Sequence, residues 1–320
     1  MATYKEIFGK TIKFLAADPP AAIGEGQIWY NDTSDTFKTS LKTAAWASGG
    51  NLGTARSYVA GTGTQTAALA VSGYAGGISN NVEEYNGASW SEQANLGTSR
   101  YSLSRGIGTQ TAGLFAGGNP PPKADSEEYN GTGWSATNSL TGGLSYLSGF
   151  GTADAALVVG GAVPRSTAVN TNESFDGTNW TANPATPFTT KEGATSGPAT
   201  AGVFAGGNPG LAASYEINST TWTTVNSMST GRKAGGFGGG AATQTAGWIA
   251  GGEEPGVTAV TEHYDGTTWS TSASIATARA KTGGAGAQAT GLIFGGGPDS
   301  GLNATEEYSD VAAVKTITAS

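Results

Sequence analysis

A short motif returns five times along the chain, and its spacing limits the folds that the chain can adopt. "EEYNGASWS" at 83–91 recurs as "EEYNGTGWS" at 127–135, as "EHYDGTTWS" at 262–270, and more loosely at 173–181 and 215–223. The tryptophans that accompany this turn are spaced by 44, 44, 46, 42 and 47 residues: Trp46, Trp90, Trp134, Trp180, Trp222 and Trp269. A period of about 40–50 residues with strand-sized pieces is typical of a β-propeller.

One period divides into four expected strands. In residues 99–140 these are "SRYSLSRGIG", "TAGLFAGG", "DSEEYNG" and "GWSATNSL", joined by Gly-containing hairpin turns. A pair of small residues ends the second strand of each period, as in Gly117-Gly118, and is expected to allow close backbone approach near the propeller axis. The repeated Tyr and Trp are expected to pack between neighbouring blades.

The two ends of the repeat region complement each other. Trp46 has no acidic-aromatic strand before it, whereas the strand around Tyr308 has no Trp after it. The sequence therefore predicts an all-β fold, a six-bladed β-propeller in which residues 41–50 supply the outer strand of the last blade. Such closure hides the sheet edges that would otherwise be exposed.

The chain is expected to divide into three parts: a β-rich N-terminal anchor segment at 1–40, the propeller at 41–310, and a C-terminal strand or tail at 311–320. About 40 residues bury little surface alone. We therefore expect apolar anchor residues to be exposed and to pack on the propeller rim, another copy of the chain or a larger assembly. A flexible tether is the alternative. The candidate anchor residues are Phe14, Ile28 and Trp29.

Composition excludes several classes of function. The net charge is −8 with no clustered basic stretch, which argues against a nucleic-acid surface. No apolar run approaches the roughly 18–20 residues of a membrane helix, so membrane insertion is not expected. The chain has no cysteine and one histidine, so neither a thiolate nor a multi-histidine metal site can form within it. No metal or cofactor is expected.

A column of acidic residues recurs in the third strand, and a basic residue recurs before each repeat. A carboxylate ring could bind a cation or act as acid and base. Because a repeated residue does the same job in every blade, pairing of the two columns is the favoured interpretation. The acidic column is Glu83, Glu127, Glu173, Glu262 and Glu306, with Tyr215 in the remaining repeat; the basic column is Arg56, Arg100, Arg232 and Arg279, with Leu144 and Lys191 as departures.

No catalytic residue is predicted. His263 has no fixed partner in the sequence, and a lone histidine of this kind is expected on a blade surface. Glu253, Glu254 and Asp299 lie off the acidic column, in loops after the second strand, and nothing in the sequence joins them in one cleft of the kind that glycosidases need.

The apolar strand ending in a Gly pair, the Glu-x-Tyr strand, the Trp that follows and the basic residue before the next repeat resemble the kelch repeat. The resemblance covers roughly residues 41–310. "MATYKEI", "DPP" and "GQIWYND", followed by "GTQTA" phrases, resemble tail-fibre-like structural proteins of marine bacteriophages. This second resemblance implies a non-enzymatic component on the surface of a phage virion. A carbohydrate-active enzyme on the same scaffold and a purely structural spacer are the alternatives.

The connections after the second strand differ from repeat to repeat, and they share one face of the predicted propeller. Loops held by a rigid scaffold are common places for binding residues. The partners expected are a host-surface glycan on this face and other virion proteins at the anchor segment, and the chain could also form a homo-oligomer. Unconstrained loops also drift, which is the alternative explanation of their variety. The candidate ligand-binding residues are Tyr74, Lys123 and Arg165.

Overall fold

The computed structural model describes residues 13–19, 27–164, 167–238, 242–253, 255–297 and 301–317. Every helix or strand element in these ranges is a β-strand, and no helix in them is long and apolar enough to span a membrane. The chain forms two compact units, one of Trp46–Tyr308 and one of Met1–Ala45 with Ser309–Ser320. These divisions lie within five residues of the boundaries expected after residues 40 and 310.

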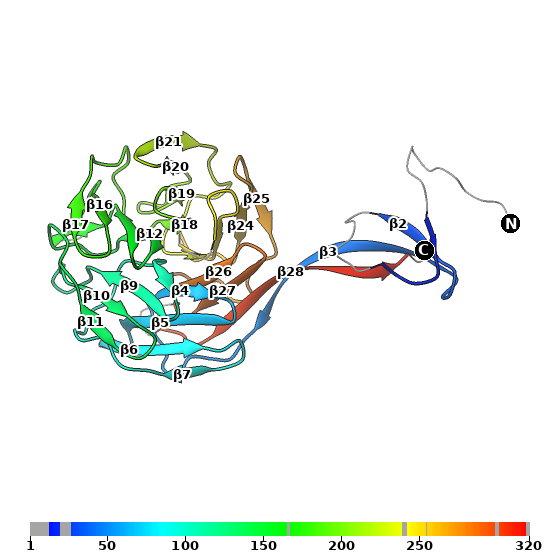
Figure 1. Ribbon diagram of the computed structural model, residues 1–320, viewed down its shortest axis with the longest axis horizontal. Helices are drawn as coiled ribbons and strands as arrows, with labels where there is room; N and C mark the ends of the chain where they lie inside the picture. Colours follow the sequence, from blue (N-terminus) through cyan, green and yellow to red (C-terminus); the bar gives the residue numbers. More distant parts are fainter. Residues whose placement is uncertain are drawn as a thin grey trace. The chain divides into compact units, whose positions relative to one another are not determined.

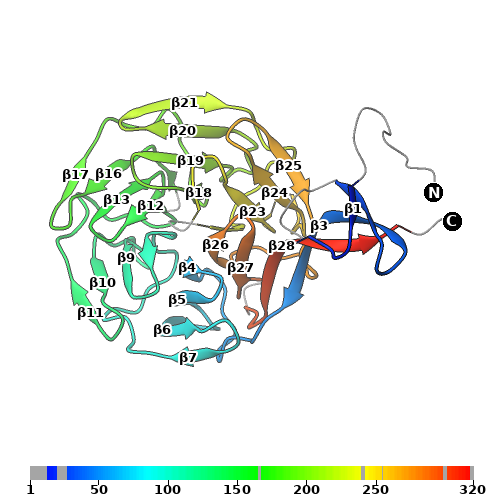
Figure 2. The ribbon, with the colours of Figure 1, turned by 45° about the vertical axis from the view of Figure 1, so that its right-hand side comes forward.

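The unit Trp46–Tyr308 contains five four-stranded antiparallel sheets arranged around a common centre (Figures 1 and 2). First strands such as β4, β12 and β18 lie near the centre, and the last strands lie at the rim. We call these sheets blades 1 to 5. Blade 1 is β4 (Ala60–Thr64), β5 (Ala67–Tyr74), β6 (Ile78–Tyr85) and β7 (Trp90–Glu92); blade 2 is β8 (Gly108–Thr109), β9 (Ala112–Ala116), β10 (Ser126–Tyr129) and β11 (Trp134–Ala136). Blade 3 is β12 (Ser148–Thr152), β13 (Ala155–Val159), β16 (Asn172–Phe175) and β17 (Trp180–Ala182), with a small sheet of β14 (Ala162–Val163) and β15 (Thr167–Ala168) in its loop. Blade 4 is β18 (Ala194–Ser196), β19 (Ala201–Ala205), β20 (Ser214–Asn218) and β21 (Thr221–Val225); blade 5 is β22 (Gly236–Phe237), β23 (Trp248–Ala250), β24 (Thr261–Tyr264) and β25 (Trp269–Ser272).

The structure has five four-stranded sheets rather than the six blades expected. The remaining strands belong to a six-stranded sheet, here called the closing sheet, of order β1-β2-β3-β28-β27-β26. Its β3 and β28 are 13 and 12 residues long, far longer than the last strands of the blades, and each contains residues of both compact units. The closing sheet consists of β1 (Lys13–Leu15), β2 (Ile28–Asn31), β3 (Thr36–Ser48), β26 (Gly283–Ala287), β27 (Thr290–Phe294) and β28 (Thr305–Thr316).

The first strand of a repeat is shorter than expected. Most of residues 99–108 is irregular, and only Gly108–Thr109 forms β8. Ser102, whose φ of 57° is left-handed, interrupts any extended strand through that position. The close backbone approach expected at the Gly pair is present: a Cβ on Gly117 would lie 2.6 Å from the carbonyl oxygen of Leu144.

The core fills the spaces between neighbouring sheets. One cluster joins Leu69 and Val71 of blade 1 to Phe115 and Tyr129 of blade 2, with Trp134 packed against it. Tryptophans also reach across the closure: the Trp90 ring lies 4.8 Å from Phe294, and that of Trp46 lies 6.0 Å from Trp248. The expected packing of Tyr and Trp between sheets is confirmed.

We call the compact unit of Met1–Ala45 with Ser309–Ser320 the leader unit. In it, β2 pairs with β1 in parallel and with β3 in antiparallel orientation. Phe14 and Ile28 are exposed, as expected. The expected exposure of Trp29 is wrong, since this side chain is only 3% exposed. Its indole N–H donates to Oδ1 of Asp18 at 3.0 Å, and Asn31 donates to the same oxygen. Trp29 is therefore a core residue of the leader unit.

Candidate functional site

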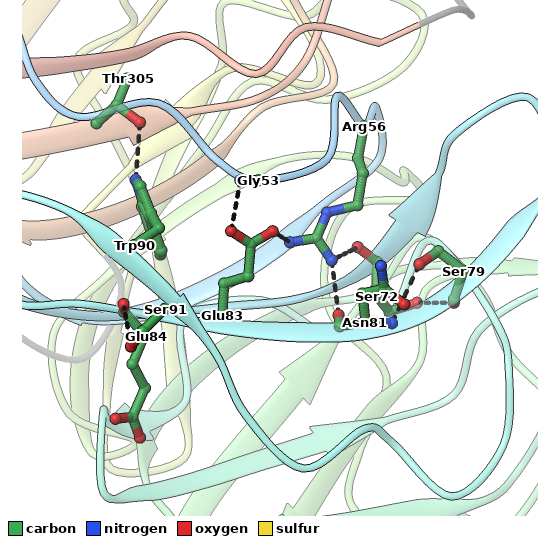
Figure 3. Close-up of polar contacts among 10 residues, drawn as sticks. All are labelled: Gly53, Arg56, Ser72, Ser79, Asn81, Glu83, Glu84, Trp90, Ser91 and Thr305. Atoms are coloured by element: carbon green, nitrogen blue, oxygen red, sulfur yellow. Dashed lines mark hydrogen bonds and ion pairs between the residues drawn. The ribbon is translucent and has the colours of Figure 1, made fainter.

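The repeated carboxylates and arginines form buried structural pairs. In blade 1, Arg56 and Glu83 are 0% and 2% exposed, and their side chains meet at 2.7 Å (Figure 3). Glu83 also accepts from the amide of Gly53 at 2.7 Å, and the guanidinium donates to the carbonyls of Ser72 and Asn81. The corresponding pairs are Arg100–Glu127 (3.2 Å), Arg279–Glu306 (2.9 Å) and Arg232–Glu262. The structural interpretation of the acidic column is confirmed.

The basic column departs from arginine at two places. The second is Thr190 and not Lys191 as expected, because Gly161 N–H donates to the carbonyl of Thr190 as Gly118 N–H donates to that of Leu144. In blade 3, where Leu144 replaces the arginine, Glu173 accepts from both the amide (2.9 Å) and the hydroxyl (2.8 Å) of Thr141. In blade 4 the acid is replaced by Tyr215, whose ring lies 4.5 Å from that of Phe188. The ion pair there gives way to aromatic packing.

A second polar column was missed from the sequence. The motif tyrosine of one sheet donates its hydroxyl to a glutamate of the sheet before it, so it connects neighbouring sheets. This glutamate precedes the corresponding tyrosine of that sheet, or Ile217 in blade 4. Burial, and then the bond to Glu84, raise the pKa of Tyr129 to about 12. The pairs are Tyr85–Glu307, Tyr129–Glu84 (3.0 Å) and Tyr264–Glu216 (2.8 Å). His263 occupies the glutamate position of blade 5, and its ring lies 5.0 Å from that of Tyr308.

The glutamine of the "GTQTA" phrase also connects neighbouring sheets. In blade 2, Gln110 reaches back to blade 1 and donates to the carbonyls of Ala68 (3.1 Å) and Tyr85 (2.7 Å). Equivalent bonds are made by Gln65, Gln244 and Gln288. The glutamine of this phrase, which is part of the phage resemblance, thus has a structural role in joining neighbouring sheets.

A different set of residues surrounds the centre. They share a position in each sheet but not a residue type. Six non-glycine residues, each just before the first strand of its sheet, have left-handed φ values between 53° and 63°. They are Tyr58, Ser102, Tyr146, Glu192, Ala234 and Lys281, and we call them the central ring. Backbone bonds connect five of them in order: Tyr146 N to Ser102 O (2.8 Å), Glu192 N to Tyr146 O (3.1 Å), Ala234 N to Glu192 O (2.9 Å) and Lys281 N to Ala234 O (2.7 Å).

One side of the central ring is aromatic. The ring centroid of Tyr58 lies 5.5 Å from that of Tyr101 and 5.9 Å from that of Tyr146. Tyr74, which follows the small pair of blade 1, lies 5.8 Å from Tyr101. All four tyrosines are partly exposed and come from blades 1 to 3. They present a wall of the kind that packs against the flat face of a ligand.

The other side of the central ring is charged. Blade 4 contributes Lys191 and Glu192, blade 5 contributes Lys233 and Glu253, and the closing sheet contributes Lys281; all five are partly exposed. The two sides touch, because Nζ of Lys281 lies 5.0 Å from the centroid of Tyr58 and Nζ of Lys191 lies 5.3 Å from that of Tyr146. Such cation–π pairs hold ammonium groups over the aromatic wall.

A cavity of about 20 Å³ lies within the central ring, with Leu103 and Arg105 completing its lining. A space of this size admits about one water-sized group. Arg105 is 9% exposed and donates to the carbonyl of Thr282 at 3.1 Å, and its guanidinium lies 5.0 Å from the centroid of Phe237. The charged group is therefore held at the wall of the cavity by fixed contacts.

Burial dominates the electrostatics of the central cavity. It lowers the pKa of Arg105 to about 10, which leaves the guanidinium charged at neutral pH. Burial also raises the pKa of Glu192, while the positive charges of Arg105, Lys191 and Lys233 oppose that rise and Glu253 adds to it. These groups from three blades are thus coupled across one small space.

Two larger hollows, of about 370 and 480 Å³, lie at equivalent places in blades 3 and 2 and include Glu173 and Glu127. Each hollow includes a glutamate of the acidic column, so the two occupy the same place in successive repeats. The central ring instead gathers residues of all six sheets, with aromatic and charged side chains among them, around one cavity. We therefore take the central ring as the candidate site.

The candidate residues from the sequence are only partly brought together. Tyr74 belongs to the aromatic wall. Lys123 does not line the central cavity; its Nζ lies 3.8 Å from Oδ2 of Asp125. Arg165, Glu254 and Asp299 lie outside the described residues. The sequence does not reveal the central ring, because its members share no residue type, although they are spaced by 44, 44, 46, 42 and 47 residues, like the tryptophans.

No group of three or more His, Cys, Asp or Glu residues placed to hold a metal ion occurs in the part of the chain that the structure describes.

The blade order, the Gly pairs and the paired Arg and Glu columns define a kelch-like β-propeller. Among solved structures, "Structure of YjhT" is similar to this chain with a TM-score of 0.66 and 14% sequence identity, over 83% of this chain and 99% of that one. YjhT has a β-propeller arrangement, and at this identity the likeness shows the fold alone. No protein-family profile matches the chain, and no curated protein is significantly similar to it.

Proposed function

We propose that the protein is a non-enzymatic component of a phage virion whose propeller binds a host-surface glycan at the central ring. The observation that carries the proposal is the asymmetry of this ring, with tyrosines on one side and charged residues on the other. Aromatic faces with a few placed polar groups are the usual lining of a small-molecule site. The resemblance of the leader and of the "GTQTA" phrases to phage tail-fibre-like proteins supplies the biological setting.

The proposal includes the architecture that presents this site. Strands β26, β27 and β28, followed outward by β3, act as a sixth blade, because Lys281 takes the same place before β26 that Tyr58 takes before β4. Residues 1–40 anchor the propeller to other virion proteins, with exposed Phe14 and Ile28 as contact residues.

The glycan proposal is tested by binding of the purified full chain to polysaccharides extracted from the host surface. Tyr146→Ala should weaken binding, because it removes part of the aromatic wall, whereas Lys42→Gln, a surface change in the other compact unit, should leave it unchanged. Equal binding by both variants would place the site elsewhere. Shortening of the polysaccharide during incubation would instead show a carbohydrate-active enzyme, and an absence of binding would favour a structural spacer.

The anchor is tested by particle assembly. Residues 41–320 retain Trp46 and all strands of the unit Trp46–Tyr308, so this truncated chain should fold. We expect it to be missing from assembled particles that incorporate the full chain. Normal incorporation would mean that the anchor lies on the propeller.

A further inference from the structure

Arg105 differs from the other buried arginines that the structure describes. Arg56, Arg100, Arg232 and Arg279 each lie within ion-pair distance of a carboxylate. Within the described ranges, no carboxylate lies within 4.0 Å of Arg105, which donates instead to the carbonyls of Thr282 and Gly235. The Glu192 carboxylate lines the same cavity and interacts electrostatically with Arg105, but it lies beyond ion-pair distance, so the guanidinium keeps its capacity to bind an anion.

The surroundings of Arg105 have the opposite sign to the protein as a whole. The chain carries a net charge of −8. Around the central ring, Arg105, Lys191, Lys233 and Lys281 provide four positive charges against the two of Glu192 and Glu253. A local excess of positive charge beside a low-dielectric wall concentrates anions at that place, even on an acidic protein.

The size of the cavity selects among anions. A space of about 20 Å³ has room for one water-sized group, such as a single oxygen of a carboxylate. The guanidinium can donate a charge-assisted hydrogen bond to that oxygen. The rest of the ligand would remain above the cavity, against the wall formed by Tyr58 and Tyr146.

We propose that the central ring recognises a carboxylate-bearing sugar of an acidic glycan, with the carboxylate at Arg105 and Lys281 and the sugar ring beside Tyr58 and Tyr146. This inference rests on the proposed function and adds the chemical class of the ligand. The geometry that carries it is the arginine without a carboxylate partner at the wall of a small cavity, next to four tyrosines.

The test measures binding of the full chain to three defined probes by calorimetry: a uronic-acid oligosaccharide, the same oligosaccharide with its carboxyl groups reduced to alcohols, and a sulfated neutral oligosaccharide. We expect the uronic-acid probe to bind, and carboxyl reduction to weaken binding about 10- to 100-fold, as for loss of hydrogen bonds to a charged group. Added salt should also weaken binding. Equal binding of the reduced probe, or tighter binding of the sulfated one, would overturn the carboxylate assignment.

Variants separate this inference from the proposed function. Arg105→Lys keeps a positive charge but loses the guanidinium donor held at the cavity wall, and it should weaken binding of the uronic-acid probe while leaving the reduced probe unaffected. Lys281→Gln provides a second variant at a partly exposed position, should Arg105→Lys disturb folding. Lys42→Gln is the matched control in the other compact unit. If neutral host glycans bind and acidic ones do not, the proposed function survives and the inference fails; if no glycan binds, both fail.

Discussion

Replacement of Arg56 by leucine should expose the energetic role of the repeated ion pair. Arg56 is fully buried, and its loss would leave the Glu83 carboxylate with the Gly53 amide as its remaining partner among those described above. Removal of one member of a buried pair costs about 3–5 kcal/mol, because the other charge stays buried without compensation. We therefore expect Arg56→Leu to lower the free energy of unfolding by about that amount.

Blade 3 suggests how to rescue this variant. There a leucine already replaces the arginine, and Thr141 donates both its amide and its hydroxyl to Glu173. The equivalent position in blade 1 is Gly53, which has no left-handed φ, and a Cβ there would lie 3.4 Å from Glu83. Gly53→Thr added to Arg56→Leu should restore about 1 kcal/mol, the net value of a typical hydrogen bond.

Urea unfolding followed by tryptophan fluorescence measures each step, with Gly53→Thr alone as the control. The reasoning is refuted if Arg56→Leu costs less than about 1 kcal/mol, well below the range for a broken buried pair. It is also refuted if Gly53→Thr changes the stability of the wild type and of Arg56→Leu equally, because the rescue depends on the unpaired carboxylate.

Two further predictions concern the tyrosine column and Glu192. Tyr129→Phe should lower the free energy of unfolding by about 1–3 kcal/mol, since it removes a hydrogen bond to the Glu84 carboxylate. Phe175→Tyr supplies the hydroxyl that blade 3 lacks opposite Glu128 and should not destabilise the protein. Urea unfolding that ranks the two variants in the opposite order would contradict the proposed role of the tyrosine–glutamate bonds. Burial raises the pKa of Glu192 above its value in the unfolded chain, so its contribution is most favourable below the unfolded pKa and is lost as pH rises through the folded pKa. Glu192→Gln should therefore melt at a higher temperature than the wild type at neutral pH and converge with it toward about pH 4; a difference that does not vary with pH would rule out this titration.

The frame of the propeller could be predicted because its residues repeat. The Glu and Arg columns, the Gly pairs and the inter-sheet tryptophans each recur at a fixed place, and the complementary ends around Trp46 and Tyr308 pointed to closure of the ring. The number of separate sheets could not be predicted in the same way. It depends on the length of β3 and β28, which contain residues of both compact units, and the repeat pattern contains no information on that length.

The candidate site was harder to predict for the opposite reason. Tyr58, Tyr146 and Glu192 share a backbone conformation and a place before the first strand, but no residue type. Conformation is not visible in a single sequence when glycine is absent from the position. The burial of Trp29 was also missed, because it depends on Asp18, 11 residues away, whose carboxylate receives the indole N–H. Both cases involve geometry that local pattern does not encode.

The left-handed backbone of the central ring has a consequence for the evolution of the protein. Non-glycine residues in this conformation cost on the order of 1–3 kcal/mol each, and glycine would avoid that strain. The main-chain bonds between Ser102, Tyr146, Glu192, Ala234 and Lys281 do not depend on side-chain type. New side chains can therefore be sampled at these positions while the frame stays unchanged. In the proposed binding role, changes at these six positions would alter the ligand that the propeller recognises, and the positions form a compact target for directed libraries.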